Sequence, residues 1–182
     1  RAIYNELFTV TLISNNYTSY NRQYEGIAGE SIKLPTFEYG NYRVYKWGQY
    51  DVGANYVISG NITLVAVWKG KTYSIMYANM TFNGRAAVTT WNGSTGVNAP
   101  TEYEYGIGLD LSKAGAYYQA DSAYSPQLRF LDWFTSMDFS TKAVEISTSS
   151  VGAVTVYAKW RYDYDNPSRN ATYTITDDGQ FS

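Results

Sequence analysis

The sequence predicts an α+β fold that is mostly β and is built from two tandem copies of one small unit. Two β-like runs, residues 63–68 and 155–160, end in the same pattern, Thr-(hydrophobic)-x-Ala-x-Trp. A second tryptophan lies upstream of each run, Trp47 before the first and Trp133 before the second. No long stretch repeats its apolar residues every 3.6 positions, as a long amphipathic helix would. A duplicated pair of signatures favours two repeat domains over one larger domain.

The first unit is expected over residues 1–70. Residues 8–13 alternate apolar and polar side chains with a period of two, which is typical of a half-buried strand. Residues 42–47 alternate in the same way, and residues 62–68 form the closing strand of the unit. Because successive side chains of a strand point to opposite faces, Trp68 shares one face of this strand with every second residue before it.

The second unit is expected over residues 71–161 and repeats this order of elements. Residues 73–77 match the first strand, residues 130–133 match the segment that ends at the upstream tryptophan, and residues 154–160 match the closing strand. Residues 162–182 then change to a charged stretch that contains a proline. We expect this last stretch to be a linker or the start of a following module.

Extra length in the second unit falls in two stretches, residues 79–100 and residues 112–127. We expect both insertions to be long loops, with a short helix within residues 112–120 or just after Trp133. Insertions in a repeat unit usually map to surface loops, often on the face that carries the function.

Composition limits the functions that the chain can have. It is 45% hydrophobic and 16% charged with a net charge of −2, which gives no reason to expect a nucleic acid or an anionic membrane as partner. It lacks the run of about eighteen apolar residues that a membrane-spanning helix needs. Histidine and cysteine are absent, which excludes Ser-His-Asp and cysteine catalysis, disulfides and the usual zinc or copper ligands. We therefore expect no cofactor and no bound metal.

Aromatic residues make up 18% of the chain, with 20 tyrosines among them. Tyrosine and tryptophan combine a large apolar face with a polar group, so they suit half-buried strands and wet contact surfaces alike. Two interpretations remain open at this point. The tyrosines cover exposed strand faces of a β-rich fold, or some of them form an aromatic platform for sugar rings or a protein partner.

Several segments carry a family resemblance. In the first unit they are residues 29–35 (Gly-Glu-Ser-Ile-Lys-Leu-Pro), Gly40, Tyr42, Val44, Trp47 and residues 62–68; in the second they are residues 105–111, Phe130, Trp133 and residues 154–160. Together they resemble the Listeria–Bacteroides repeat, the B-repeat of internalin-type bacterial surface proteins. The resemblance covers about residues 7–160. It departs from the family pattern where Lys46 and Asp132 replace a glycine, and in the long insertions of the second unit.

The resemblance implies a compact β-grasp-like fold, with several strands around a short helix, in each of two tandem domains. It also implies a secreted or cell-wall-attached bacterial protein of several domains. In that family the repeats extend a binding head from the cell or contribute to adhesion themselves.

Four tryptophans are expected to be structural because both units carry them, namely Trp47, Trp68, Trp133 and Trp160. Trp91 matches no repeated position and is flanked by polar residues, so we consider it a candidate contact residue, with simple loop packing as the alternative. The candidate ligand-binding residues on the second insertion are Tyr117, Tyr118, Gln119, Asp121 and Tyr124. Aromatic faces beside amide and carboxylate groups are the chemistry that a sugar-binding surface needs. Tyr17, Tyr20 and Tyr24 form a weaker cluster of the same kind.

Catalysis is not expected. A glycosidase needs two facing carboxyl groups, and no motif marks such a pair here. The sequence therefore favours a non-enzymatic extracellular spacer and adhesion module, whose partners are a host protein or a glycan and the neighbouring modules of its own polypeptide. A carbohydrate-binding module with an aromatic platform on the insertions is the alternative. A third hypothesis is an adhesin that binds a protein by adding a strand at an exposed sheet edge.

Overall fold

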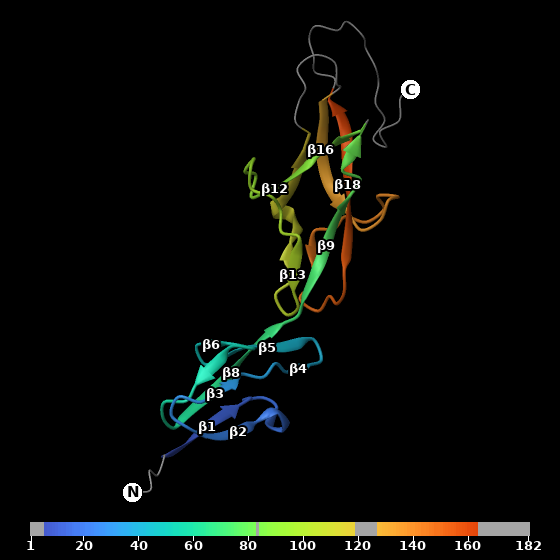
Figure 1. The fold of residues 1–182 in the computed structure, drawn as a ribbon. Coiled ribbons are helices and arrows are strands. Elements are labelled where there is room, and N and C mark those ends of the chain that lie inside the picture. Colours follow the sequence, from blue (N-terminus) through green and yellow to red (C-terminus); the bar gives the residue numbers. More distant parts are fainter. Residues whose placement is uncertain (1–5, 83, 119–126, 164–182) are drawn as a thin grey trace, which may run out of the picture. The chain divides into compact units, whose positions relative to one another are not determined.

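The structure is a computed structural model that describes residues 6–82, 84–118 and 127–163. The chain forms two compact units, Arg1–Lys71 and Thr72–Ser182, which are described separately. Both are mostly β, as predicted (Figure 1). The expected α component is wrong for the described residues, where the helical segments are two 3-10 turns, Thr18–Tyr20 and Leu111–Lys113.

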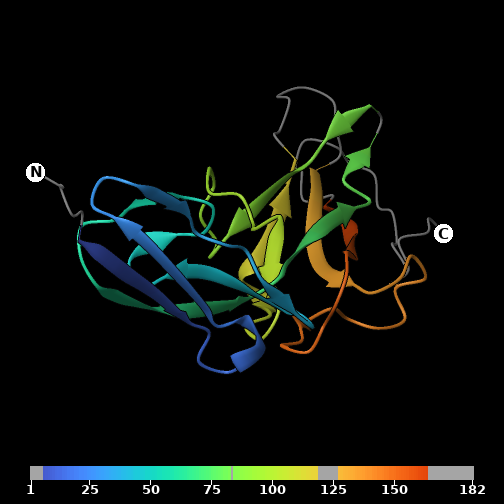
Figure 2. The same ribbon diagram turned by 60° about the horizontal axis from the view of Figure 1, so that its bottom comes forward.

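The described part of the first unit contains eight strands: β1 (Leu7–Ile13), β2 (Arg22–Ile27), β3 (Ser31–Lys33), β4 (Glu38–Tyr39), β5 (Tyr42–Trp47), β6 (Tyr50–Asp51), β7 (Asn55–Val57) and β8 (Ile62–Gly70). The main sheet has the order β2-β1-β8-β5-β4, with β6 paired to β5, and β3 and β7 form a separate antiparallel pair. The first strand and the last strand of the unit are therefore neighbours in the middle of the sheet, where they run parallel. Figure 2 shows these strands in blue to green.

Alternation along β1 and β8 builds the core of the first unit. Val10 and Leu12 of β1 and Leu64 of β8 are buried on one face of the sheet, while their strand neighbours lie on the other. Trp47 of β5 is fully buried on the same core, with an exposed fraction of 0%. The β3–β7 pair contributes the buried Tyr56 to the same core.

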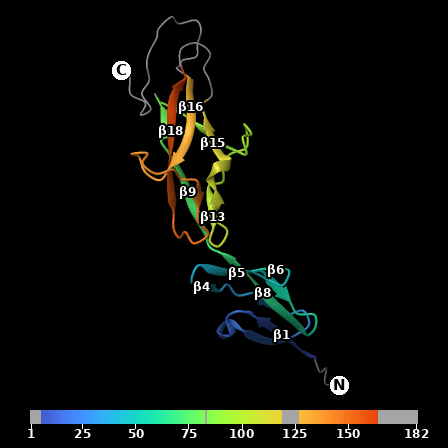
Figure 3. The ribbon, with the colours of Figure 1, turned by 180° about the vertical axis from the view of Figure 1, so that it is seen from behind.

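The second unit contains ten strands in its described part: β9 (Thr72–Ala78), β10 (Thr81–Phe82), β11 (Arg85–Ala86), β12 (Val88–Trp91), β13 (Glu102–Glu104), β14 (Leu109–Asp110), β15 (Ala114–Tyr117), β16 (Gln127–Phe134), β17 (Glu145–Ile146) and β18 (Val154–Asp163). The main sheet has the order β13-β9-β18-β16. Its first and last strands, β9 and β18, are again parallel neighbours. Figures 1 and 3 show them side by side from opposite directions.

Three local expectations for the second unit are corrected. The insertions are not simply loops, because β10, β11 and β12 lie in the first of them and β15 lies in the second. The helix expected within residues 112–120 is instead one 3-10 turn followed by β15. The helix expected after Trp133 is absent, since β16 continues to Phe134 and bends and turns follow. The last strand, β18, ends at Asp163, and the expected linker over residues 162–182 lies almost wholly outside the described part, which ends at residue 163.

Strand formation in the insertions has a physical cause. β12 pairs with β15 in an antiparallel register that sets Thr90 opposite Gly115 and Trp91 opposite Ala114. The β-branched residues of β12 favour an extended backbone. A Cβ atom at residue 115 would lie 2.7 Å from the Thr90 hydroxyl oxygen, so a larger residue there would force the Thr90 side chain to shift. One strand of the first insertion, β12, thus pairs with a strand of the second, β15, which local sequence patterns do not reveal.

Candidate functional site

The four tryptophans that both units carry each donate an indole N–H hydrogen bond to a backbone carbonyl oxygen of their own unit. Trp47 Nε1 donates a hydrogen bond to the carbonyl oxygen of Pro35 at 2.8 Å, and Trp133 Nε1 donates to that of Ala114 at 2.9 Å. Both side chains are buried. A buried indole that finds an acceptor contributes both packing and a hydrogen bond, so these two residues belong to the cores and not to a ligand site.

The tryptophans of the closing strands make a second matching pair of bonds. Trp68 Nε1 donates to the Ser14 carbonyl oxygen at 2.7 Å, and Trp160 Nε1 donates to the Asn79 carbonyl oxygen at 2.8 Å. Both rings are half-buried and pack against the core of their own unit. Each bond joins the last strand to the residue that follows the first strand.

The structure describes only three of the six candidate binding residues of the two insertions, and these three are half-buried. Trp91 is half-buried in β12 and packs against the core of the second unit. Tyr117 is half-buried in β15, and the ring of Tyr118 lies 4.6 Å from that of Trp160. Gln119, Asp121 and Tyr124, which the sequence analysis grouped with them, lie outside the described residues.

A cluster of aromatic side chains lies in the first unit, and we call it the Tyr39 cluster. Its members are Tyr17, Tyr20, Phe37, Tyr39 and Trp68. The rings of Tyr17 and Tyr39 are 4.1 Å apart, and Tyr20 stacks on Phe37 at 4.8 Å. Tyr39 is 54% exposed, so the cluster reaches the surface. An exposed ring with half-buried rings behind it is a suitable contact surface for a sugar ring or an apolar side chain.

Short local structure positions this cluster. The 3-10 turn Thr18–Tyr20 carries Tyr20, whose hydroxyl donates to the Glu38 carbonyl oxygen at 2.9 Å. The guanidinium of Arg22 lies 5.0 Å from the centre of the Phe37 ring, a cation–π contact. The ammonium of Lys71 forms an ion pair with Glu38 at 2.6 Å. The cluster is therefore bordered by both signs of charge.

Sequence reasoning found only part of the Tyr39 cluster. It grouped Tyr17 and Tyr20 with Tyr24 and missed Phe37 and Tyr39. The run Phe37-Glu38-Tyr39, which places two aromatic residues just after Pro35, was the available signal.

One edge strand of the kind that the adhesin hypothesis requires is β2 of the first unit. Among the described residues this strand pairs with β1 alone. It contains no proline, and its two charged residues, Arg22 and Glu25, are exposed. Its backbone edge could therefore accept another strand.

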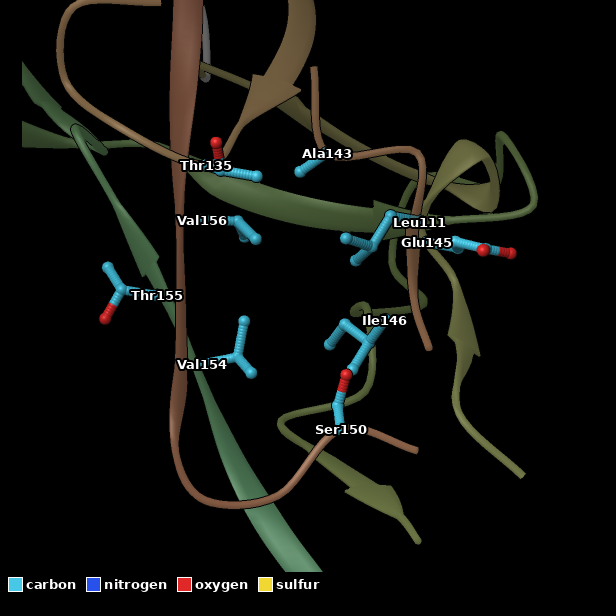
Figure 4. Close-up of a pocket in the computed structure, with 9 residues that line it drawn as sticks. All are labelled: Leu111, Thr135, Ala143, Glu145, Ile146, Ser150, Val154, Thr155 and Val156. Carbon is cyan, nitrogen blue, oxygen red and sulfur yellow. The ribbon is translucent and has the colours of Figure 1, made fainter. Parts of the chain in front are cut away.

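A cavity of about 300 Å³ lies in the second unit (Figure 4). It is lined by Leu111, Thr135, Ala143, Glu145, Ile146, Ser150, Val154, Thr155 and Val156. Val154 and Val156 of β18 point across the space toward the side of Leu111 and Ile146. The lining includes one carboxylate, that of Glu145, so the cavity does not hold the facing carboxyl pair that glycoside hydrolysis requires.

Backbone pairing explains why this space is open. Leu111 N donates to Val144 O, and two residues later Ile146 projects into the cavity lining. In the first unit Leu34 N donates to Ala54 O, and the residue two positions later is the buried Tyr56. At the position that corresponds to Tyr56, the second unit has the smaller Ile146. Less of the space beneath the β14–β17 pair is therefore filled.

Packing and turns shift the side-chain pKa of four described residues, all of them in the second unit. Burial raises the pKa of Tyr77 to about 12, and its hydroxyl donates to the Pro100 carbonyl oxygen at 2.8 Å. Burial also raises the pKa of Tyr103, whose hydroxyl donates to the Gly152 carbonyl oxygen. Hydrogen bonds from serine hydroxyls lower the carboxyl pKa of Asp110 and of Asp138. These are the effects of packing and of turns and do not identify an acid–base pair.

No cluster of three or more His, Cys, Asp or Glu side chains that could hold a metal ion occurs in the part of the chain that the structure describes. Within the same ranges, no helix is long and apolar enough to cross a membrane. In comparisons with known proteins, no family model, no curated protein and no solved structure matches the chain.

Proposed function

We propose that the chain is a non-enzymatic extracellular module composed of two tandem B-repeat-like, β-grasp-like units. In this proposal it belongs to a secreted or cell-wall-attached bacterial surface protein. The module spaces the domains on either side of it and contributes an adhesive surface for a host protein.

One observation carries the repeat assignment, namely the identical spacing of the Trp–carbonyl bonds. In the first unit Val10 pairs with Ile62. The bond joins residue 14, four positions after Val10, to residue 68, six positions after Ile62. In the second unit Ile75 pairs with Val154. The bond joins residue 79, again four positions after Ile75, to residue 160, again six positions after Val154. Two unrelated β units would not be expected to share both the parallel register and this bond, so duplication of one unit is the simplest explanation.

The spacer role is supported by the separate cores. Each unit buries its own set of apolar side chains, without a disulfide, since the chain has no cysteine. Small units with separate cores are suited to being repeated along a polypeptide. The half-burial of Trp91 and Tyr117 favours the spacer over a platform built from those residues.

Adhesion is assigned to the Tyr39 cluster. Tyr39 is exposed, its ring packs on Tyr17, and Tyr17 in turn contacts Trp68. Aromatic anchors of this kind contribute much of the binding energy in protein interfaces.

The test uses beads coated with the full chain, whose retention is measured on surfaces carrying host extracellular proteins. We expect Tyr39→Ala to reduce retention severalfold, since it removes the exposed ring. Met137→Ala is the matched control because Met137 is 73% exposed and lies outside the cluster. Equal retention of the two variants would contradict the assignment of adhesion to this cluster.

A parallel titration addresses the alternative function. Tryptophan fluorescence is followed while soluble starch, xylan, β-glucan and mannan are added. Fluorescence that does not change during the titration would agree with the spacer function. A saturable shift that Trp91→Ala or Tyr117→Ala abolishes would instead establish a carbohydrate-binding module with its site on the insertions.

A further inference from the structure

The parallel strand pair of each unit determines how a force on the two ends of that unit acts on its hydrogen bonds. In the first unit, the chain enters at the start of β1 and leaves at the end of β8, and these two strands are adjacent and parallel. The entry point and the exit point therefore lie at opposite ends of one hydrogen-bonded ladder. A force that pulls them apart acts along the strands, so the bonds of the ladder are loaded together and not one after another.

Side-chain hydrogen bonds extend this ladder at both ends. The ladder runs from Val10↔Ile62 to Ile13↔Val65. Before it, Thr9 N donates to Asn61 Oδ1 at 2.8 Å. After it, Trp68 Nε1 donates to Ser14 O at 2.7 Å.

The second unit repeats the arrangement. β9 and β18 are parallel from Ile75↔Val154 to Ala78↔Tyr157. Beyond the ladder, Trp160 Nε1 donates to Asn79 O at 2.8 Å, and Asn79 Nδ2 donates to Ala158 O at 2.6 Å. Asn79 thus makes two bonds to the closing strand. Its φ of 58° is in the left-handed region, which asparagine tolerates better than most residues.

The core lies directly beneath these ladders. Val10, Leu12 and Leu64 of the first unit are buried under the parallel pair. Water cannot readily compete for ladder bonds that are covered by packed side chains, so sliding of one strand past the other requires the core to open as well.

We propose that each unit is a mechanical clamp that keeps its fold when the polypeptide is pulled lengthwise. The strands that resist the pull are β1 with β8 in the first unit and β9 with β18 in the second, and a Trp–carbonyl bond reinforces each pair. The proposal rests on the proposed spacer function only for the source of the load, which is the pull between an adhering domain and the cell. The clamp itself is a property of the strand geometry.

Single-molecule force spectroscopy on the full chain tests this geometry directly. Because the chain has no cysteine, two introduced cysteines give unique attachment points. Glu6→Cys with Lys71→Cys loads the β1–β8 ladder along its length. Glu6→Cys with Gly60→Cys pulls the same two strands apart from one end, and a Cβ at residue 60 meets no atom within 4 Å.

The lengthwise geometry should require a rupture force about three to four times that of the other geometry, because four residue pairs share the load. Complete unfolding between residues 6 and 71 releases about 230 Å of chain at about 3.5 Å per residue, which identifies the event. Similar rupture forces in the two geometries would overturn the proposal.

A pair of variants separates the clamp from general stability. Trp68→Phe removes the bond at the far end of the ladder, so it should lower the lengthwise force and leave the force in the other geometry unchanged. Tyr20→Phe is the matched control, because it removes a bond to Glu38 O that lies outside the ladder. An equal loss of lengthwise force in both variants would contradict the role of Trp68. Neither result depends on adhesion, so failure of the clamp and failure of the bead assay are distinguishable.

Discussion

Trp133→Phe is the substitution whose cost the structure defines most closely. Trp133 is 1% exposed, and its Nε1 donates to Ala114 O. Ala114 is the first residue of β15, so this bond ties the sheet made by the two insertions to the main sheet of the second unit. Phenylalanine keeps most of the apolar ring and removes the donor.

Two effects add to the expected loss of stability. A buried carbonyl that loses its donor costs about 1–3 kcal/mol. The smaller ring leaves roughly 40 Å³ unfilled, which at about 24 cal/mol per Å³ costs about 1 kcal/mol more. We therefore expect the free energy of unfolding of the second unit to fall by about 2–4 kcal/mol.

The measurement is native-state hydrogen exchange followed amide by amide. In Trp133→Phe, protection should decrease in β9, β16 and β18 while the amides of β1 and β8 keep theirs, because the two units have separate cores. Trp47→Phe is the matched substitution in the first unit and should give the reverse pattern. A loss below about 0.5 kcal/mol, or equal losses in both units, would refute this reasoning.

Three further predictions concern the second unit. Gly115→Ala should destabilise it by about 1–3 kcal/mol in urea unfolding, since the added methyl would crowd the Thr90 hydroxyl, whereas Gly60→Ala has open space and should change little. Ile146→Tyr should partly fill the cavity and raise the melting temperature, and a lower value would show that the space cannot accept a ring. Because burial raises the folded-state pKa of Tyr77 to about 12, its contribution to stability is complete below pH 10 and is lost as pH rises from 10 to 12. Tyr77→Phe should weaken that alkaline dependence in circular dichroism, and an unchanged dependence would count against this cause.

Local patterns predicted the strands that meet the core. The alternation in β5 and β8 and at the start of β18 was visible in the sequence because a sheet with one buried face needs an apolar side chain at every second position. The mostly β character followed from this alternation and from the lack of a helical period. The short helix was wrong because residues 114–117 pair with β12 instead of with their own neighbours.

The candidate site was predicted less well. Trp91 looked like an exposed loop residue because polar residues surround it in the sequence, yet its strand pairs with β15 and its ring packs on the core. The Tyr39 cluster brings Tyr17, Tyr39 and Trp68 together from three distant positions. No window of the sequence contains all three, so only the folded chain shows which ring remains exposed.

The sequence by itself determined that the chain is β-rich, that two closing strands end in the same pattern, and that histidine and cysteine chemistry is excluded, because composition and period-two alternation are local properties. The tertiary structure decided that the insertions pair with each other, that the first and last strands of each unit are parallel neighbours, and that the space beside Ile146 is open. These features depend on contacts between residues far apart in the chain, where pairing and packing depend on the whole fold.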